Sequence, residues 1–119
     1  MGKAIADTNV IVGFLTGRDT LLDAVWGRYE DIYVSGEVLC EVIYIMTKMY
    51  SVPRAELTEK LFLLLRREKF VYERWLTDAL FYYRDYKNLG IVDACLLARS
   101  MKEGMEILTA DKDLYKLTS

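Results

Sequence analysis

The sequence predicts an α/β fold with a mostly parallel sheet, formed as one domain over residues 1–119. Short apolar runs of strand length alternate with longer segments whose apolar residues recur at helical spacing. Connections that contain helices are crossovers, and crossovers join parallel strands. Hydrophobic residues make up 53% of the 119 residues, which is enough to build a core in a domain of this length.

The first quarter of the chain begins with a predicted strand. Residues 3–6 form a short apolar run that Asp7 ends. Residues 9–15 continue as an apolar turn or the start of a helix, and Gly17 breaks this segment. A helix is predicted over residues 20–29, because its apolar side chains fall on one face.

The middle of the chain predicts a strand followed by two helices. Residues 32–34 form the second strand, and Ser35 is a residue type that caps helix N-termini. The helix that it starts runs to about Tyr50, and Pro53, the only proline, marks the break that follows. A third helix is predicted over residues 55–69, where leucines form one stripe.

The remaining sequence predicts two strands and two helices. Residues 70–72 form a strand, and a helix capped by Thr77 and Asp78 runs through Lys87. Another helix spans residues 91–103 and ends with a glycine in the position that follows a helix C-terminus. The last strand is predicted over residues 106–109, and a single helical turn over residues 113–116.

Two predicted strands end at acidic residues. Asp7 follows the run 3–6, and Asp111 follows the run 106–109. Ligands of parallel sheets bind beyond the carboxyl ends of the strands, so this topology places the two carboxylates together. Two simpler interpretations stay open. Asp7 can make an Asx turn as the chain leaves its strand. Either Asp111 or Asp113 can cap the last helical turn, and Asp113 is favoured because it directly precedes Leu114.

Two further acids lie on the apolar sides of predicted helices. Val38, Val42 and Ile45 surround Glu41, and Asp93 shares a face with two leucines, although Asp93 can also serve as a helix cap. An ionised carboxylate is costly to desolvate unless a cation meets it. We therefore expect Asp7, Glu41, Asp93 and Asp111 to converge on a common cation.

The residue inventory narrows the chemistry of this expected site. The chain has no histidine, which excludes Ser–His and Cys–His nucleophiles, and it has no glycine-rich phosphate loop. Oxygen ligands without histidine favour a hard divalent ion such as Mg²⁺ or Mn²⁺. The sequence thus predicts a metal-dependent enzyme that acts on phosphate esters.

Composition limits the partners and the location of the protein. A net charge of −2 argues against broad, charge-driven coating of nucleic acid, although a local basic rim could still surround an acidic site. The basic residues that could supply such a rim are Lys48, Arg54, Arg66, Arg67 and Lys69. No apolar run approaches the roughly 20 residues that span a bilayer, and the N-terminus lacks a signal-peptide core, so we expect a cytoplasmic protein with no membrane partner.

Aromatic residues exceed what one small core easily buries. They can line a dimer interface or stack on nucleobases, and packing in the core is the simpler explanation for at least half of them. The residues concerned are Tyr44, Tyr50, Phe81, Tyr82, Tyr83 and Tyr86.

Four motifs in order carry a resemblance to a known family. They are Ile-Ala-Asp-Thr-Asn at 5–9, Val-Leu-Cys-Glu-Val-Ile-Tyr at 38–44, Ile-Val-Asp-Ala-Cys-Leu-Leu-Ala at 91–98, and Ile-Leu-Thr-Ala-Asp-Lys-Asp at 107–113. With these motifs the chain resembles the PIN-domain nucleases, particularly the VapC-type toxins, over nearly its whole length. Each motif alone is weak, but four in the family's order are specific.

The resemblance implies a three-layer α/β/α sandwich around a central, mostly parallel sheet, and an acidic pocket that binds Mg²⁺ or Mn²⁺. It implies an endoribonuclease, a hydrolase that cuts RNA phosphodiester bonds. The positions that match the family's catalytic and metal-binding acids are Asp7, Glu41, Asp93 and Asp111; those that match its accessory residues are Thr8, Asn9, Thr109 and Asp113.

The resemblance also suggests partners. These are an RNA substrate, a cognate antitoxin if the protein is the toxin of a toxin–antitoxin pair, and a second copy in a homodimer. The alternative is a catalytically silent PIN fold that binds RNA or protein. A phosphatase with an aspartyl nucleophile fits less well, because such enzymes carry Asp-x-Asp after the first strand and this chain has Asp7-Thr-Asn9.

Overall fold

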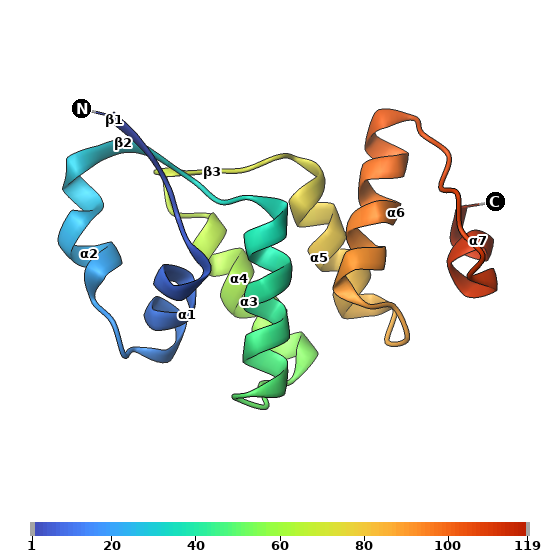
Figure 1. Ribbon diagram of the computed structural model, residues 1–119, viewed down its shortest axis with the longest axis horizontal. Coiled ribbons are helices and arrows are strands. Elements are labelled where there is room, and N and C mark those ends of the chain that lie inside the picture. Colours follow the sequence, from blue (N-terminus) through green and yellow to red (C-terminus); the bar gives the residue numbers. More distant parts are fainter. Residues whose placement is uncertain (1, 119) are drawn as a thin grey trace. The chain divides into compact units, whose positions relative to one another are not determined.

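The computed structural model describes residues 2–118 and has the predicted α/β fold (Figure 1). The chain divides into two compact units, Met1–Glu73 and Arg74–Ser119, and each is described here by itself. The first unit contains the strands β1 (Gly2–Ile5), β2 (Tyr29–Tyr33) and β3 (Phe70–Val71), the helices α1 (Thr8–Thr16), α2 (Leu21–Val25), α3 (Gly36–Lys48) and α4 (Arg54–Leu65), and the 3₁₀ turn η1 (Trp26–Arg28).

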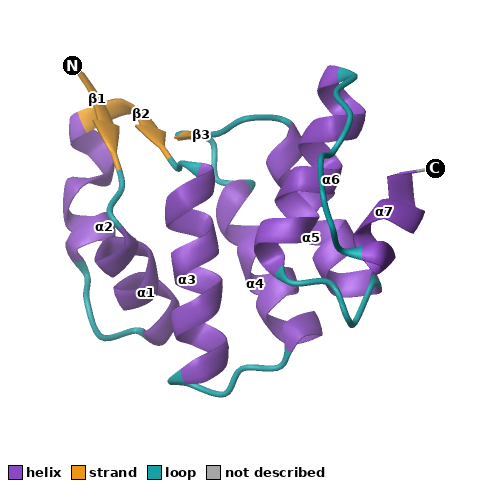
Figure 2. Ribbon diagram, turned by 45° about the vertical axis from the view of Figure 1, so that its right-hand side comes forward, coloured by secondary structure: helices purple, strands orange, loops and turns teal. Residues whose placement is uncertain are grey.

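The sheet of the first unit is parallel, as predicted. Its strand order is β1-β2-β3, with Lys3 opposite Asp31 and Ile32 opposite Phe70 (Figure 2). Helices occupy the connections between the strands, which is the arrangement that parallel pairing requires. Ile32 is buried in this sheet, and the strand β1 forms one edge of it.

Helix boundaries in the first unit follow local capping chemistry. Ser35 caps α3, since its Oγ accepts a hydrogen bond from the backbone N–H of Val38 at 3.2 Å. The apolar segment after Asp7 is a full helix, α1, which ends at Gly17 in the left-handed conformation (φ 70°) that glycine adopts without strain.

The predicted helix over residues 20–29 is shorter in the structure. Helix α2 ends at Val25, η1 follows, and Tyr29 already belongs to β2. The side chain of Lys69 holds this turn, because its Nζ donates to the backbone oxygens of Trp26 (2.6 Å) and Tyr29 (3.1 Å). Carbonyls that accept from a lysine no longer need helical partners, so the helix stops early.

The second unit consists of helices α5 (Trp75–Asp85), α6 (Ile91–Glu103) and α7 (Lys112–Thr118). Helices α5 and α6 pack against one another, and their buried hydrophobic residues are Trp75, Leu76, Ala79, Leu80, Tyr83, Ala94, Leu97 and Ala98. An ion pair between Lys102 and Asp78 (3.2 Å) links the two helices at the surface. Helix α7 contributes one buried apolar side chain, Leu114.

The predicted strand at residues 106–109 is wrong. Residues 105–109 have no regular secondary structure, and none of the described residues pairs with them as a strand. A strand is stable when a neighbour satisfies its backbone groups and covers one face, whereas the side chain of Leu108 is 96% exposed. The segment is instead tied back to α6: the N–H of Met105 donates to the oxygen of Ser100 (2.9 Å).

None of the helices formed by residues 2–118 is long and apolar enough to cross a membrane.

Candidate active site

Asp93 stands in the first turn of α6, which begins after Gly90. The helix has no side-chain cap, so the capping role that the sequence left open for Asp93 is not realised. Its carboxylate is half-buried and has no hydrogen bond or ion pair with any residue in the range 2–118. A negative charge in the first turn of a helix interacts favourably with the helix dipole.

Asp111 directly precedes α7 and caps it. One carboxylate oxygen, Oδ1, accepts from the backbone N–H groups of Asp113 (2.9 Å) and Leu114 (3.1 Å). Thr109 supports the same turn, because its Oγ1 accepts from the N–H of Asp111 at 3.0 Å. Asp111 therefore caps the last helix, whereas the favoured candidate Asp113 lies inside it. The second oxygen, Oδ2, makes no hydrogen bond with the part of the chain that is described.

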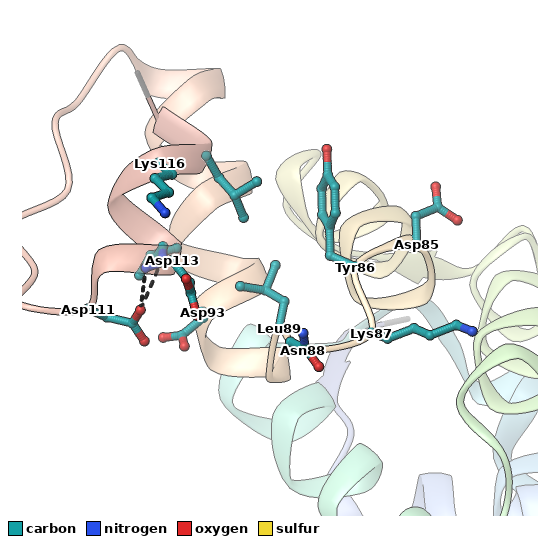
Figure 3. Close-up of a pocket in the computed structure, with 11 residues that line it drawn as sticks. Asp85, Tyr86, Lys87, Asn88, Leu89, Asp93, Asp111, Asp113 and Lys116 are labelled. Carbon is teal, nitrogen blue, oxygen red and sulfur yellow. Dashed lines mark hydrogen bonds between the residues drawn. The ribbon is translucent and has the colours of Figure 1, made fainter.

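Asp93 and Asp111 line one pocket, a cavity of about 450 Å³ in the second unit (Figure 3). Both carboxylates are drawn at the same end of this pocket, which Asp113 also lines. The full lining is Asp85, Tyr86, Lys87, Asn88, Leu89, Asp93, Asp111, Asp113, Leu114, Lys116 and Leu117.

The remaining predicted site residues belong to the first unit. Asp7 follows β1, is exposed, and accepts from the N–H of Thr8 at 2.7 Å as the N-cap of α1. Thr8 is buried and Asn9 is exposed. Asp7 therefore combines the expected position at a strand end with the turn-forming role that the sequence left open.

Glu41 lies on α3 but outside the buried face of that helix, which consists of Leu39, Val42, Ile43 and Met46. It is exposed and has no hydrogen bond or ion pair within residues 2–118. The expectation that all four acids are desolvated is thus wrong: Asp7, Glu41 and Asp111 are exposed and Asp93 is half-buried. The cost of burying a carboxylate therefore does not explain the positions of these four acids in the fold.

The phenol of Tyr33, near the carboxyl end of β2, has a raised pKa. Burial raises its pKa, and the negative charges of Glu73 and Glu37 raise it further. Its hydroxyl lies 3.5 Å from Glu73 Oε1. This tyrosine therefore stays protonated at neutral pH and acts as a hydrogen-bond donor at this end of the sheet.

Sequence motifs did not identify the other side of the pocket. Tyr86, Lys87 and Asn88 form a turn between α5 and α6, closed by a hydrogen bond from Leu89 N–H to the oxygen of Tyr86 (2.9 Å). Lys116 lines the pocket from α7. The sequence feature that could have indicated this turn is its position, because it immediately precedes the helix that carries Asp93.

A comparison with known families matches residues 4–119 to the PIN domain. The chain belongs to the PIN-domain family. PIN domains are generally nucleases and typically bind divalent metal ions. Membership of the family therefore makes the acidic pocket a candidate site for such an ion. Comparisons with curated proteins and with solved structures return no match.

The donor set of this PIN domain suits the family's metals. The pocket offers carboxylate oxygens and no thiol or imidazole, which is the ligand chemistry of Mg²⁺ and Mn²⁺. Over residues 2–118, however, no three acidic or cysteine side chains stand close enough together to hold a metal ion. Asp93 and Asp111 alone would supply only part of a coordination shell, and Mg²⁺ commonly completes such a shell with water.

Proposed function

We propose that this PIN domain is a divalent-metal-dependent endoribonuclease that hydrolyses RNA phosphodiester bonds. The observation that carries the proposal is the pocket of the second unit, in which two PIN-motif acids, Asp93 and Asp111, lie at the same end. Neither acid is in an ion pair with the described residues. Adjacent carboxylates of this kind favour binding of a cation.

Asp93 and Asp111 would hold the metal, and Asp7 and Glu41 are proposed as further acidic members because the sequence motifs around them resemble those of the family. A bound Mg²⁺ or Mn²⁺ supplies Lewis acidity toward a phosphoryl oxygen and acidifies a bound water. The N–H groups of Asp113 and Leu114 hold the Asp111 carboxylate by one oxygen and fix the direction of the other. Glu41 is either a ligand or a proton acceptor.

The test is cleavage of labelled single-stranded RNA with Mg²⁺ or Mn²⁺, beside EDTA, for the wild type and for Asp93→Asn. We expect metal-dependent cleavage that falls at least about 100-fold in the variant, because asparagine keeps the shape of the side chain but loses its charge. Asp7→Asn and Glu41→Gln test the two members of the first unit in the same way. Thermal melting checks that every variant folds.

Asp85→Asn is the matched control. Asp85 lines the same pocket, but its carboxylate pairs with Arg84 (2.9 Å) and points away from Asp93 (Figure 3). We expect this variant to cleave RNA like the wild type. Folded wild-type protein that neither binds Mn²⁺ nor cleaves RNA would refute the enzyme and favour the catalytically silent RNA- or protein-binding alternative.

A role as the toxin of a toxin–antitoxin pair is the narrower form of this proposal. An antitoxin that inhibits through the pocket would present a basic side chain to Asp93 and Asp111, since buried charge complementarity gives specific binding. A neighbouring gene for a small DNA-binding protein that abolishes cleavage on co-expression would support this role. Homodimerisation is likewise proposed, and light scattering of the purified chain measures it directly.

A further inference from the structure

Helices α5 and α6 are joined by a contact that involves an exposed methionine. The hydroxyl of Tyr82 on α5 donates to the sulfur of Met101 on α6 at 3.3 Å. The two helices belong to the same unit and lie side by side (Figure 1). A thioether is a weak hydrogen-bond acceptor, so this contact is a weak link between the helices.

The side chain of Met101 is open to small oxidants. It is 63% exposed, whereas Met46 in the core of the first unit is 3% exposed. An oxidant must reach the sulfur before methionine can become the sulfoxide, and exposure provides this access. Met49 is also accessible, since it is 75% exposed. What distinguishes Met101 is the tyrosine hydroxyl that already points at its sulfur.

Oxidation of Met101 converts a weak acceptor into a strong one. When hydrogen peroxide reacts with the thioether, the O–O bond breaks, an S–O bond forms and the sulfur loses two electrons. The proton of the transferred oxygen passes to the leaving oxygen, which departs as water. The product, methionine sulfoxide, is polar, and its oxygen accepts hydrogen bonds better than a thioether sulfur.

Tyr82 links this contact to a second aromatic side chain. Its ring stacks on Tyr86, with centroids 5.9 Å apart and planes at 18°. The backbone between the two residues is held, because the N–H of Tyr86 donates to the oxygen of Tyr82 (2.9 Å). A change in the hydrogen bond of Tyr82 should therefore alter the near-ultraviolet circular dichroism of this tyrosine pair.

We propose that Met101 is a site of reversible oxidation, at which the sulfoxide oxygen replaces the sulfur as acceptor of the Tyr82 hydroxyl and strengthens the link between α5 and α6. Two effects oppose one another. A sulfoxide loses apolar contacts, but an exposed side chain has little buried apolar surface to lose. The stronger hydrogen bond therefore dominates, and the oxidised protein should be more stable to heat.

The experiment treats the full chain with dilute hydrogen peroxide and measures thermal melting and near-ultraviolet circular dichroism. The parent carries Met49→Leu and Met105→Leu, which leaves Met101 as the exposed methionine of residues 2–118. Mass spectrometry of peptides locates the sulfoxide. We expect oxidation to raise the melting temperature by about 1–5 °C, and methionine sulfoxide reductases to reverse the shift.

Two matched variants in the same background separate the proposed contact from oxidation elsewhere. Met101→Leu keeps an apolar side chain of similar size without sulfur, so peroxide should leave its melting temperature unchanged. Tyr82→Phe keeps the ring but removes the hydroxyl. Its Met101 should still be oxidised, yet the melting temperature should not rise, because no donor is present to meet the sulfoxide.

The outcomes are decisive in both directions. A rise in the parent that is absent from Tyr82→Phe supports the exchange of acceptor. A melting temperature that stays constant or falls although Met101 is fully oxidised overturns it, and so does an equal rise in Tyr82→Phe. If Met101 of the wild type resists peroxide that oxidises Met49, the modification site itself is refuted. None of these results depends on whether the protein cleaves RNA.

Discussion

At the residue scale, Asp111 has two roles in one side chain. One oxygen caps α7 and the other side of the carboxylate belongs to the acidic pair. We predict that Asp111→Asn and Asp111→Ala both abolish metal-dependent cleavage but differ in stability. Asparagine caps helices as well as aspartate does, whereas alanine should cost about 0.5–2 kcal/mol, measured by urea unfolding. Equal stability of the two variants would contradict the capping role.

Residue chemistry also decided which parts of the site were predictable. Asp93 and Asp111 were found from sequence because acids at a helix start and after an apolar run stand in recognisable motifs. Lys116 and Asn88 were not found, because an exposed lysine on a helix and an asparagine in a turn are ordinary surface residues by every local rule. Only the pocket that they share with the acids gives them significance.

At the element scale, the end of α6 depends on one glycine. Gly104 has a positive φ of 67°, and Met105 N–H returns to the oxygen of Ser100. We predict that Gly104→Ala destabilises the protein by roughly 1 kcal/mol, since a Cβ is strained in this conformation. Gly27→Ala is the control, because Gly27 is not among the glycines with positive φ and a Cβ added there meets open space. Equal unfolding free energies for both variants would show that the αL cap is unimportant.

Local signals predicted some helix ends and missed others. The cap predicted at Thr77 and Asp78 is wrong, because α5 already begins at Trp75 and has no side-chain cap. Ser35 and Gly104 mark helix ends by their own chemistry, and both positions are confirmed. The helix predicted over residues 20–29 was interrupted by a lysine about forty residues away in sequence, a contact that no local pattern reveals. The strand predicted over residues 106–109 has the right residue types but no partner among the described residues, and partners define strands.

At the scale of the whole molecule, the protein engages many of its cations internally. Arg67 lies 4.2 Å from the centroid of the Trp26 ring and pairs with Asp23 (3.8 Å), and Lys69 binds backbone oxygens. The surface ion pairs of the second unit occupy others, namely Arg84 with Asp85, Arg99 with Glu103 and Lys102 with Asp78. With a net charge of −2, the chain has no overall excess of positive charge for an extended phosphate track.

We therefore predict that RNA binding depends only weakly on salt. If one or two phosphates are neutralised, the slope of log K against log salt concentration should lie between about −0.7 and −1.4 for a single strand. Lys116→Gln should reduce its magnitude by about 0.7, and Lys48→Gln should leave it unchanged. Anisotropy titrations over a range of KCl concentrations measure it, and a slope steeper than about −4 would reveal a basic track that these ion pairs do not predict.

The exposed segment between α6 and α7 has a consequence for engineering. Residues 105–110 lack regular structure, and the helix that follows them buries only Leu114, yet that helix carries one wall of the pocket. Segments with few buried contacts tolerate exchange better than packed ones. Residues after Gly104 can thus be treated as a replaceable module. Chimeras that graft this stretch from other PIN domains, with Asp111 and Leu114 retained, offer a route to altered RNA preference on an unchanged α5–α6 pair.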